Sequence, residues 1–403
     1  MEAVLILGGS VSQLPAIRHA RARGLRVVVA DGDEGALGFV EADEAVQVDF
    51  SDVGRLVETA RRLRVDGLAA ICSDRAVLAA ASAAEQLGLP GIGTDVALRM
   101  TNKAAMRAWL AEHGVPQPPF AVVRTFEEAV AAITRIGMPA VIKPVDSGGQ
   151  RGVFRIDLRR DLAGLLAGAL AFSTSGTAIV ERYVDGSELN VIAVARGGRV
   201  ELLTISDRLR PPGVGFGVGW IHCYPSKLAA TALEEAADVA IRAVRALGLR
   251  DGIAFPQLLV NDEGIHVVEV AARVPAGQMA DLVYHAIGVD LIDIALCQAL
   301  GRAVADDAVS PGETRPVAVR FFTAAPGILP TGQVRSVSGL DAVRAAPGVL
   351  AADLYIQLGE TIRPVQVDAD RRGYVVATGA DGGAALSAAT AAMTRLEVRT
   401  HVV

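Results

Sequence analysis

The chain has 403 residues, of which 51% are hydrophobic and 4% aromatic, and its formal net charge at pH 7 is −6. This length predicts two or three domains with buried cores. No run of about 18 apolar residues is present to span a membrane, and without a basic tract we do not expect nucleic acid as a partner. Three separated cysteines form no disulfide framework, so we expect a cytoplasmic protein.

The first 98 residues alternate β-branched runs with amphipathic stretches, which is typical of βαβ units on a parallel sheet. Gly8 and Gly9 follow the first strand, and Asp31 ends the second. These residues imitate a dinucleotide-binding fingerprint, but the third glycine of that pattern is missing, which disfavours NAD. The expected strands are residues 4–7, 26–30, 44–48 and 67–71, and the expected helices are residues 15–23, 53–63 and an alanine-rich stretch ending at 87.

Residues 99–305 are predicted to form a second domain, and residues 306–403 a small α+β domain of short strands and a final helix. Gly197 and Gly198 connect one expected pair of antiparallel strands, and residues 261–264 connect another. The second domain is expected to contain helices at 103–113, 126–136 and 229–247, and strands at 140–143, 178–183, 188–195, 200–205, 253–260 and 265–270.

Only three lysines occur among 39 basic residues, so a lysine in this chain is unusual. Lys103 opens a helix, and Lys143 ends an apolar strand just before the loop Ser-Gly-Gly-Gln-Arg-Gly at 147–152. Glycines let backbone N–H groups approach phosphate oxygens, and an ammonium is a compact counter-charge for them. The loop is not a Walker A motif, and a plain turn with surface lysines is the alternative reading. Lys227 has no such context and is expected to be exposed.

Several acidic and amide side chains could complete such a site. Glu181 and Glu188 end or begin strands and could accept hydrogen bonds from a base or sugar, although solvated strand ends would look the same. Gln257 and Glu269 lie on the two arms of one hairpin, where their oxygens could share a divalent cation. Arg273 follows four residues later and suits a carboxylate or phosphate.

Five motifs occur in an order and at spacings that resemble the ATP-grasp superfamily, in particular the branch with biotin carboxylase, carbamoyl-phosphate synthetase and the L-amino acid ligases. The resemblance covers the whole chain. It implies an α/β and α+β protein with a Rossmann-like pre-ATP-grasp domain (1–98), an ATP-grasp domain (99–305) with a mobile lid at about 115–185, and a small C-terminal α+β domain (306–403). The motifs are Lys103, Lys143-Pro, the loop at 147–152, Glu181 to Glu188, and Gln257 with Glu269-Val-Ala-Ala-Arg273.

The resemblance also implies a role for each matched residue, with ATP and Mg²⁺ or Mn²⁺ as cofactors. Arg273 and Lys143 would be the catalytic residues: Arg273 would bind the substrate carboxylate and stabilise the acyl phosphate or tetrahedral species, and Lys143 would hold ATP phosphates. ATP would be bound by Lys103, Lys143, the loop residues Ser147, Gly148, Gly149, Gln150 and Gly152, Glu181 and the backbone of Val184 at adenine, and Glu188 at ribose, and the metal by Gln257 and Glu269.

One position departs from the family pattern. Members usually have Glu-x-Asn-x-Arg, with the asparagine as a metal ligand, whereas this chain has Ala271 there. Many members also have an acid where Gln257 stands, although carbamoyl-phosphate synthetase has glutamine. Two ligands are therefore weakened or missing, and a second Mg²⁺ would rest on Glu269, ATP and water alone or on another residue. This departure puts turnover in doubt more than ATP binding.

Weaker signals concern the substrates. A long glycine-rich loop at 206–220 carries Arg208 and Arg210 and falls where related ligases recognise substrate, but a plain solvent loop fits equally well. His222 follows this loop, and a lone histidine is more often structural. Gly277 belongs to the run Pro275-Ala-Gly-Gln-Met after Arg273, which we expect to line the acceptor pocket.

The leading hypothesis is an ATP-dependent carboxylate–amine ligase. ATP would phosphorylate a carboxylate, and an amine, expected to belong to an amino acid, would attack the acyl phosphate to form an amide or peptide bond with release of ADP and phosphate. Small-molecule carboxylates and amines are then the partners, and a homodimer is the family expectation. The alternatives are a carbamoyl-phosphate or carboxylase-type enzyme and an ATP-binding module with lost turnover.

Overall fold

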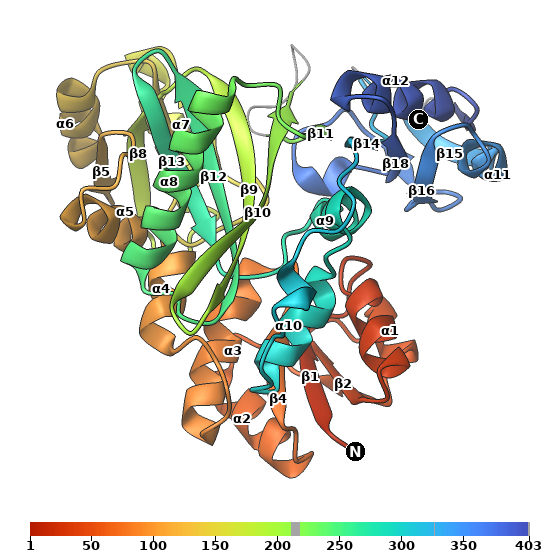
Figure 1. The fold of residues 1–403 in the computed structure, drawn as a ribbon. Helices are drawn as coiled ribbons and strands as arrows, with labels where there is room; N and C mark the ends of the chain where they lie inside the picture. Colours follow the sequence, from red (N-terminus) through yellow and green to blue (C-terminus); the bar gives the residue numbers. More distant parts are fainter. Residues whose placement is uncertain (211–217, 326, 402–403) are drawn as a thin grey trace.

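The computed structural model describes residues 1–210, 218–325 and 327–401. Its N-terminal part contains the predicted parallel sheet (Figure 1). Its strand order is β3-β2-β1-β4, and every pairing in it is parallel. All five residues of β1 are buried, because helices cover both faces of the sheet. Its elements are β1 (Ala3–Leu7), α1 (Leu14–Ala22), β2 (Arg26–Asp31), β3 (Glu44–Gln47), α2 (Val53–Arg62), β4 (Gly67–Ala70), α3 (Asp74–Leu87) and α4 (Thr94–Thr101).

A second, antiparallel sheet has the order β5-β8-β6-β7 and carries two helices on one face. Sequence patterns predict β6, β8 and α6 but miss β5, β7 and α7. Both missed strands are four residues or shorter, and α7 reads Leu-Ala-Gly-Leu-Leu-Ala-Gly-Ala-Leu, with no polar face to reveal its period. The elements here are α5 (Lys103–Glu112), β5 (Phe120–Val123), α6 (Phe126–Ile136), β6 (Ala140–Pro144), β7 (Phe154–Ile156), α7 (Leu162–Leu170) and β8 (Ala178–Arg182).

The largest sheet has eight strands in the order β13-β12-β9-β10-β11-β14-β18-β16. Both predicted hairpins, β9 with β10 and β12 with β13, are present and antiparallel. The predicted boundary near residue 306 lies between β13 and β14, and this sheet runs across it (Figure 1). Its strands and packed helix are β9 (Ser187–Arg196), β10 (Arg199–Leu209), β11 (Ile221–Tyr224), α8 (Ala230–Leu247), β12 (Gly252–Asn261), β13 (Gly264–Ala271), β14 (Val317–Phe321), β16 (Val349–Leu354) and β18 (Gly373–Thr378).

The two helices after β13, α9 and α10, lie between the N-terminal sheet and the C-terminal lobe, which contains β14 to β19 (Figure 1). The link to the N-terminal sheet is direct, because Ile71 and Val274 form a parallel bridge and the N–H of Cys72 donates to the carbonyl of Val274. The end of β4 is thereby held next to the segment that follows β13. The remaining elements are α9 (Met279–Ile287), α10 (Leu291–Ala299), β15 (Gly332–Ser338), α11 (Leu340–Arg344), β17 (Thr361–Ile362), α12 (Gly382–Met393) and β19 (Glu397–His401).

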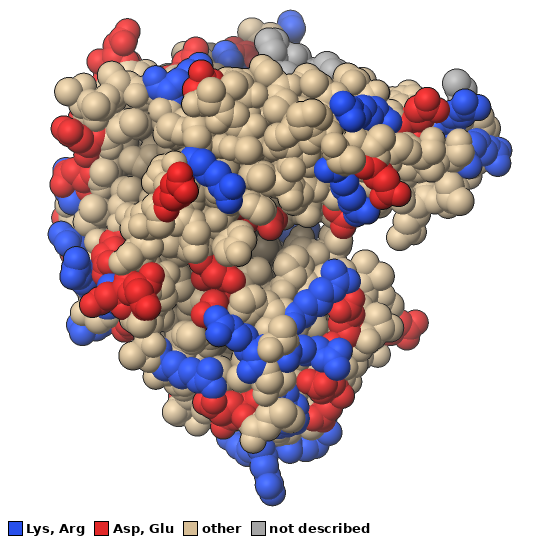
Figure 2. All heavy atoms as spheres, turned by 45° about the vertical axis from the view of Figure 1, so that its right-hand side comes forward, with Lys and Arg blue, Asp and Glu red and all other residues tan. Residues whose placement is uncertain are grey.

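The surface carries charges of both signs. On the face shown in Figure 2 basic and acidic side chains alternate, and a hollow separates the N-terminal domain from the C-terminal lobe. Among the described residues no helix is both long enough and apolar enough to cross a membrane.

Candidate active site

Lys143 and Glu181 form the centre of a buried ion-pair network on the four-stranded sheet. Lys143 lies on β6 and Glu181 on the adjacent β8, with Nζ and Oε2 2.8 Å apart. Arg107 of α5 reaches the other oxygen, with its Nε 2.7 Å from Oε1 of Glu181. Because Glu181 is only 4% exposed, the alternative reading of a solvated strand end is wrong for it.

Opposite charges in this network shift each other's pKa values, although two cations share one carboxylate. Burial alone would raise the pKa of Glu181, but Arg107 and Lys143 outweigh it and lower that pKa to about 2. Burial lowers the pKa of Lys143, and the Glu181 carboxylate offsets only part of this effect. Arg107 also donates to the carbonyls of Val267 and Val268 on β13, so the network joins the sheet β5-β8-β6-β7 to the eight-stranded sheet.

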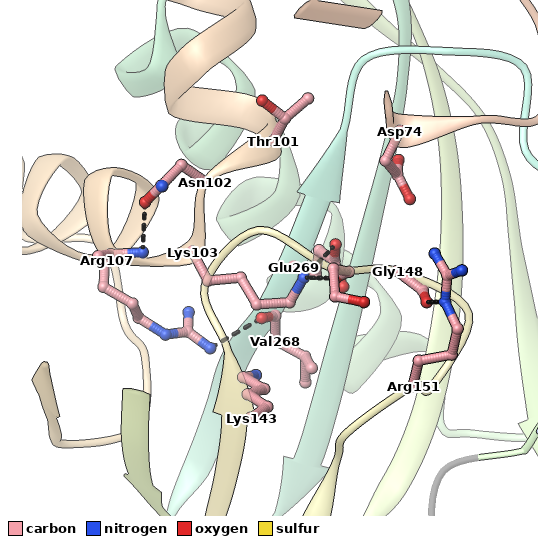
Figure 3. Close-up of polar contacts among 12 residues, drawn as sticks. Asp74, Thr101, Asn102, Lys103, Arg107, Lys143, Gly148, Arg151, Val268 and Glu269 are labelled. Carbon is pink, nitrogen blue, oxygen red and sulfur yellow. Dashed lines mark hydrogen bonds and ion pairs between the residues drawn. The ribbon is translucent and has the colours of Figure 1, made fainter. Parts of the chain in front are cut away.

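Lys103 reaches the same region from the start of α5. Asn102 caps this helix, its Oδ1 accepting from the N–H groups of Ala104 and Ala105, which fixes where the lysine emerges. The Nζ of Lys103 donates to the carbonyl of Ser147 at 2.9 Å and lies 3.2 Å from Oε1 of Glu269 (Figure 3). Lys103 thus holds the glycine loop and the β12–β13 hairpin together, and its side chain is 9% exposed, which excludes the surface reading.

The glycine loop packs closely against the N-terminal domain. A Cβ on Gly148 would lie 2.8 Å from a carboxylate oxygen of Asp74, so a larger residue would displace that carboxylate or the loop. Gly149 and Gln150 both adopt positive φ, at 67° and 66°. Gly152 plays another part: it lines neither cavity described below, and a Cβ there would press on Phe172.

Three side chains form a row across neighbouring strands β9, β12 and β13. Asn190 pairs with Gln257, and Gln257 pairs with Glu269, as the predicted hairpin register requires. The Nε2 of Gln257 donates to Oδ1 of Asn190 at 3.3 Å, which turns the Gln257 oxygen away from Asn190. Glu269 and Gln257 therefore supply two oxygen donors of the kind that Mg²⁺ prefers.

His222 of β11 extends this row. Its Nδ1 lies 2.9 Å from Nδ2 of Asn190. Burial, with the charges of Arg208 and Arg371, lowers the pKa of His222 well below its usual value, so the ring is neutral at pH 7. A neutral ring can accept at Nδ1, and Asn190 then donates to His222 while accepting from Gln257. His222 thus fixes the orientation of the Asn190 side chain.

Arg273 follows β13 and faces the N-terminal domain. Its Nε and Nη2 lie 2.6 and 3.0 Å from the two carboxylate oxygens of Asp74, at the start of α3. Burial opposes both charges, but the pair raises the pKa of Arg273 and lowers that of Asp74, so both stay charged. The guanidinium is thus held by the N-terminal domain in one orientation.

Glu188, Arg208 and Arg210 form a third group of charges. Glu188 of β9 pairs with Arg208, and its other oxygen lies 3.3 Å from Nε of Arg210. The prediction that Arg208 lies in a loop is wrong, since it belongs to β10, and its 8% exposure excludes the alternative of a solvent loop for this residue. The middle of that predicted loop, residues 211–217, lies outside the described residues.

Two small cavities gather almost every predicted residue. The Lys143 cavity, of about 110 Å³, lies between the sheet β5-β8-β6-β7 and the eight-stranded sheet, and the Arg273 cavity, of about 100 Å³, adjoins it. Both are lined by Gly148, Gly149, Gln150, Arg208, Gln257 and Glu269. The Lys143 cavity adds Lys103, Lys143, Ser147, Glu181, Val184, Glu188 and Arg210, and the Arg273 cavity adds His222, Arg273 and Gly277.

Comparison with known proteins agrees with this geometry. The family model described as ATP-grasp domain matches residues 100–277, that of the ATP-grasp N-terminal domain residues 17–91, and that of the L-amino acid ligase C-terminal domain 2 residues 320–401. An uncharacterized protein, y4rH, of Sinorhizobium fredii is 30% identical over 91% of this chain and 75% of its own length.

The chain belongs to the ATP-grasp family.

Members of the ATP-grasp family are ligases that form carbon–nitrogen bonds with release of ADP. The crystal structure of an L-amino acid ligase from Bacillus licheniformis matches the fold with a TM-score of 0.83, at 19% identity, over 100% of this chain and 99% of that one. The carbamoyl phosphate synthase large chain of Thermomicrobium roseum is 29% identical over 70% of this chain, which spans only 28% of that protein.

Several residues of this ATP-grasp site escaped the sequence analysis. Asp74 carried one available signal, since it follows the carboxyl end of a parallel strand, where such sheets place their ligands. Arg107 is one arginine among many, and Asn190 lies inside an apolar strand. Arg371, which belongs to the C-terminal segment, lines the Arg273 cavity although it lies nearly a hundred residues after the last motif. Only the folded chain brings these four to the site.

Ala271 leaves the proposed metal site with fewer protein ligands than the family pattern has. It is 3% exposed and lines the Arg273 cavity without offering a ligand. Among the described residues, no group of three or more histidine, cysteine, aspartate or glutamate side chains could hold a metal ion. Glu269 and Gln257 fit one hard cation that takes its remaining oxygens from nucleotide and water.

Proposed function

We propose that this protein is an ATP-dependent ligase that joins a small carboxylate to an amine, with an amino acid as one substrate, through an acyl phosphate. One observation carries the proposal: two buried lysines, an oxygen pair suited to Mg²⁺ and a fixed arginine line two adjoining cavities between the sheets. The C-terminal match to the L-amino acid ligase domain supports the choice of an amino acid.

ATP is proposed to occupy the Lys143 cavity. Lys103 and Lys143 would neutralise its phosphates, and Val184 and Glu181 would meet the adenine while Glu188 meets the ribose. At about 110 Å³ the cavity is smaller than the ~300–1,000 Å³ of typical ligand pockets. The glycine loop, held by the Lys103–Ser147 contact, would therefore lift to admit the nucleotide and exchange that contact for phosphate.

The reaction is proposed to take place at Arg273. An oxygen of the substrate carboxylate forms a bond to the γ-phosphorus, and the bond from phosphorus to ADP breaks. The amine nitrogen then bonds to the carbonyl carbon, loses a proton, and phosphate leaves. Mg²⁺ would supply neutralisation of phosphate charge when it is bound. Arg273 would orient the carboxylate and offset the negative charge that develops on it.

The proposal is tested by product analysis with purified protein, ATP, Mg²⁺ and amino acids supplied singly and in pairs. We expect ADP and phosphate to appear only with a productive pair, together with a dipeptide or amide detected by mass spectrometry. AMP release would contradict it, because AMP indicates adenylation. Nucleotide binding without stimulated ADP release in any combination would favour the ATP-binding module that Ala271 suggests.

Two further features remain proposals of the same kind. A homodimer is the expectation, and one solved relative, the biotin carboxylase domain of a 2-oxoglutarate carboxylase from Hydrogenobacter thermophilus, forms a dimer in its crystal structure. Mn²⁺ in place of Mg²⁺ would suit the mixed amide and carboxylate donors of Gln257 and Glu269. Light scattering and metal titration of ADP release test these two points.

A further inference from the structure

A third cavity, of about 330 Å³, adjoins the Arg273 cavity and has no part in the proposed ATP site. The two cavities share Ala276, Gly277, Asp368 and Arg371 as lining residues. We name it the Asp281 cavity after an acid on its wall. Its wall includes the loop after β4, the start of α9, and the C-terminal residues Tyr355, Asp368, Ala369, Arg371 and Arg372.

The backbone around the Asp281 cavity is held in uncommon conformations. Cys72 and Gln278, both on its wall, have positive φ values of 58°, although neither is glycine. The N–H of Cys72 donates to Val274, and Nε2 of Gln278 donates to the hydroxyl of Tyr355 at 2.8 Å. Strained backbone that neighbouring contacts keep in place is frequent at ligand sites.

Four charged side chains line this cavity, and three of them are compensated. Arg371 lies 3.7 Å from Asp368 and stacks over the ring of Phe321, with 4.3 Å to its centroid. Arg372 lies 3.3 Å from a carboxylate oxygen of Glu360. In each of these two pairs the positive and negative charges cancel. The net charge near the cavity wall is therefore determined by the fourth charged group, Asp281.

Asp281 is the uncompensated charge. Among the residues that the structure describes, it has no hydrogen-bond or ion-pair partner, and it lies in the first turn of α9. Burial, followed by the charge of Asp290, raises its pKa to about 6. The negative charge of Asp281 also helps to raise the pKa values of the Tyr355 and Tyr374 phenols, after the larger effect of their burial. A cation placed here would remove an electrostatic cost that the protein alone carries.

We propose that the Asp281 cavity binds the ammonium group of a small amino-acid substrate, with Asp281 as its counter-charge. This inference rests on the proposed ligase function and names the group recognised beside its reaction centre. The size supports a small molecule, since 330 Å³ is at the low end of ligand pockets. Arg371, which lines both cavities, would face the carboxylate of the substrate while Asp281 faces its ammonium, and together they would set its orientation.

The test uses Asp281→Asn, with Asp281→Glu as the variant that retains the charge. The matched control is Asp95→Asn, because Asp95 also lies in the first turn of a helix, α4, but lines none of the three cavities. Binding of the twenty L-amino acids and of their α-hydroxy acid counterparts is measured by calorimetry in the presence of ADP and Mg²⁺. ADP release is measured in parallel.

We expect Asp281→Asn to weaken binding of the recognised amino acid at least about tenfold, the effect of one lost charge-assisted contact. Binding of the α-hydroxy acid should not change, Asp281→Glu should restore part of the affinity, and Asp95→Asn should match the unmodified protein. Turnover measurements show which substrate carries the recognised ammonium. If KM rises for the substrate whose carboxylate is phosphorylated, the ammonium belongs to that substrate. If KM rises for the attacking amine, the ammonium belongs to the amine substrate.

Other outcomes separate this inference from the proposed function. If no pair of amino acids releases ADP but Asp281→Asn still abolishes amino acid binding, the ligase proposal fails and the assignment of the cavity stands. Unchanged binding of every amino acid in Asp281→Asn would overturn the assignment, whether or not ADP is released. Absence of amino acid binding to the unmodified protein would overturn it as well.

Discussion

The Lys143 cavity and the Asp281 cavity differ in how their charges are compensated. In the first, Glu181 pairs with both Lys143 and Arg107, so each buried charge has an opposite charge beside it, and one positive charge of the three is left over. In the second, Asp281 has no such partner among the described residues, and a ligand would have to supply the opposite charge. The charges proposed to meet the nucleotide are therefore paired within the protein, whereas the charge proposed to recognise the substrate has no such partner in the described part of the chain.

The largest expected effect is on stability. Glu181→Gln leaves Lys143 and Arg107 buried without their counter-charge, so the free energy of unfolding should fall by about 3–5 kcal/mol. Urea denaturation measures this. Asp281→Asn should cost little by the same measurement, because no partner is stranded, and Glu263→Gln, in an exposed pair with Arg182, should cost about 0–1 kcal/mol. Equal losses for Glu181 and Asp281 would remove the contrast between the two cavities.

The same pair predicts a pH dependence of stability. The pKa of Glu181 is about 2 in the folded protein against a usual 4.5, so its contribution is complete above pH 4.5. That contribution is lost as the pH falls through 4.5 towards 2, when the unfolded chain binds the proton first. Unfolding free energies measured across this range should fall less steeply in Glu181→Gln than in the unmodified protein.

A change at Arg273 should have the next largest effect, on catalysis. Arg273→Lys removes the two-point contact with Asp74 and the planar donor set, so kcat should fall about 10²–10³-fold, as for loss of other charge-stabilising donors. Asp74→Asn keeps the guanidinium but loosens it, and the fall should be about tenfold. If Asp74→Asn increased kcat, Asp74 would be a competitor of the substrate carboxylate rather than a support for Arg273.

Lys143→Ala should weaken nucleotide binding in the first cavity. Loss of a charge-assisted contact is worth about 1.5–3 kcal/mol, which is roughly 10–100-fold in Kd for ATP. Calorimetry with a non-hydrolysable ATP analogue measures this value. The control is Lys227→Ala, since Lys227 is exposed and lines neither cavity of the site. An unchanged Kd in Lys143→Ala would refute the assignment of this cavity to ATP.

The smallest expected effect concerns the metal. Ala271→Asn adds an oxygen donor on the wall of the Arg273 cavity, beside the row of Gln257 and Glu269. The Mg²⁺ concentration that gives half-maximal ADP release should fall about tenfold, the scale of a well-placed metal-site contact. Manganese binding followed by electron paramagnetic resonance gives an independent reading. No change in either measurement would show that a metal does not lie near position 271.

Much of the fold was predictable because it follows local periodicity. The parallel strands near the N-terminus and both long hairpins were recognised from β-branched runs and glycine turns, and the hairpin register placed Gln257 opposite Glu269. Short strands such as β7 and the featureless helix α7 were missed, since three residues or a wholly apolar segment carry no period. No local sequence pattern indicates that the C-terminal strands β14, β18 and β16 extend the eight-stranded sheet.

The sequence by itself determined the family, the order of the motifs and the residue types available for phosphate, metal and carboxylate. These depend on spacing along the chain, which survives in the folded protein. Only the tertiary structure decided which charges meet. Arg107 pairs with Glu181 across 74 positions and Asp74 with Arg273 across 199. Electrostatic energy depends on distance in space and on burial, and neither can be read from positions so far apart in the sequence.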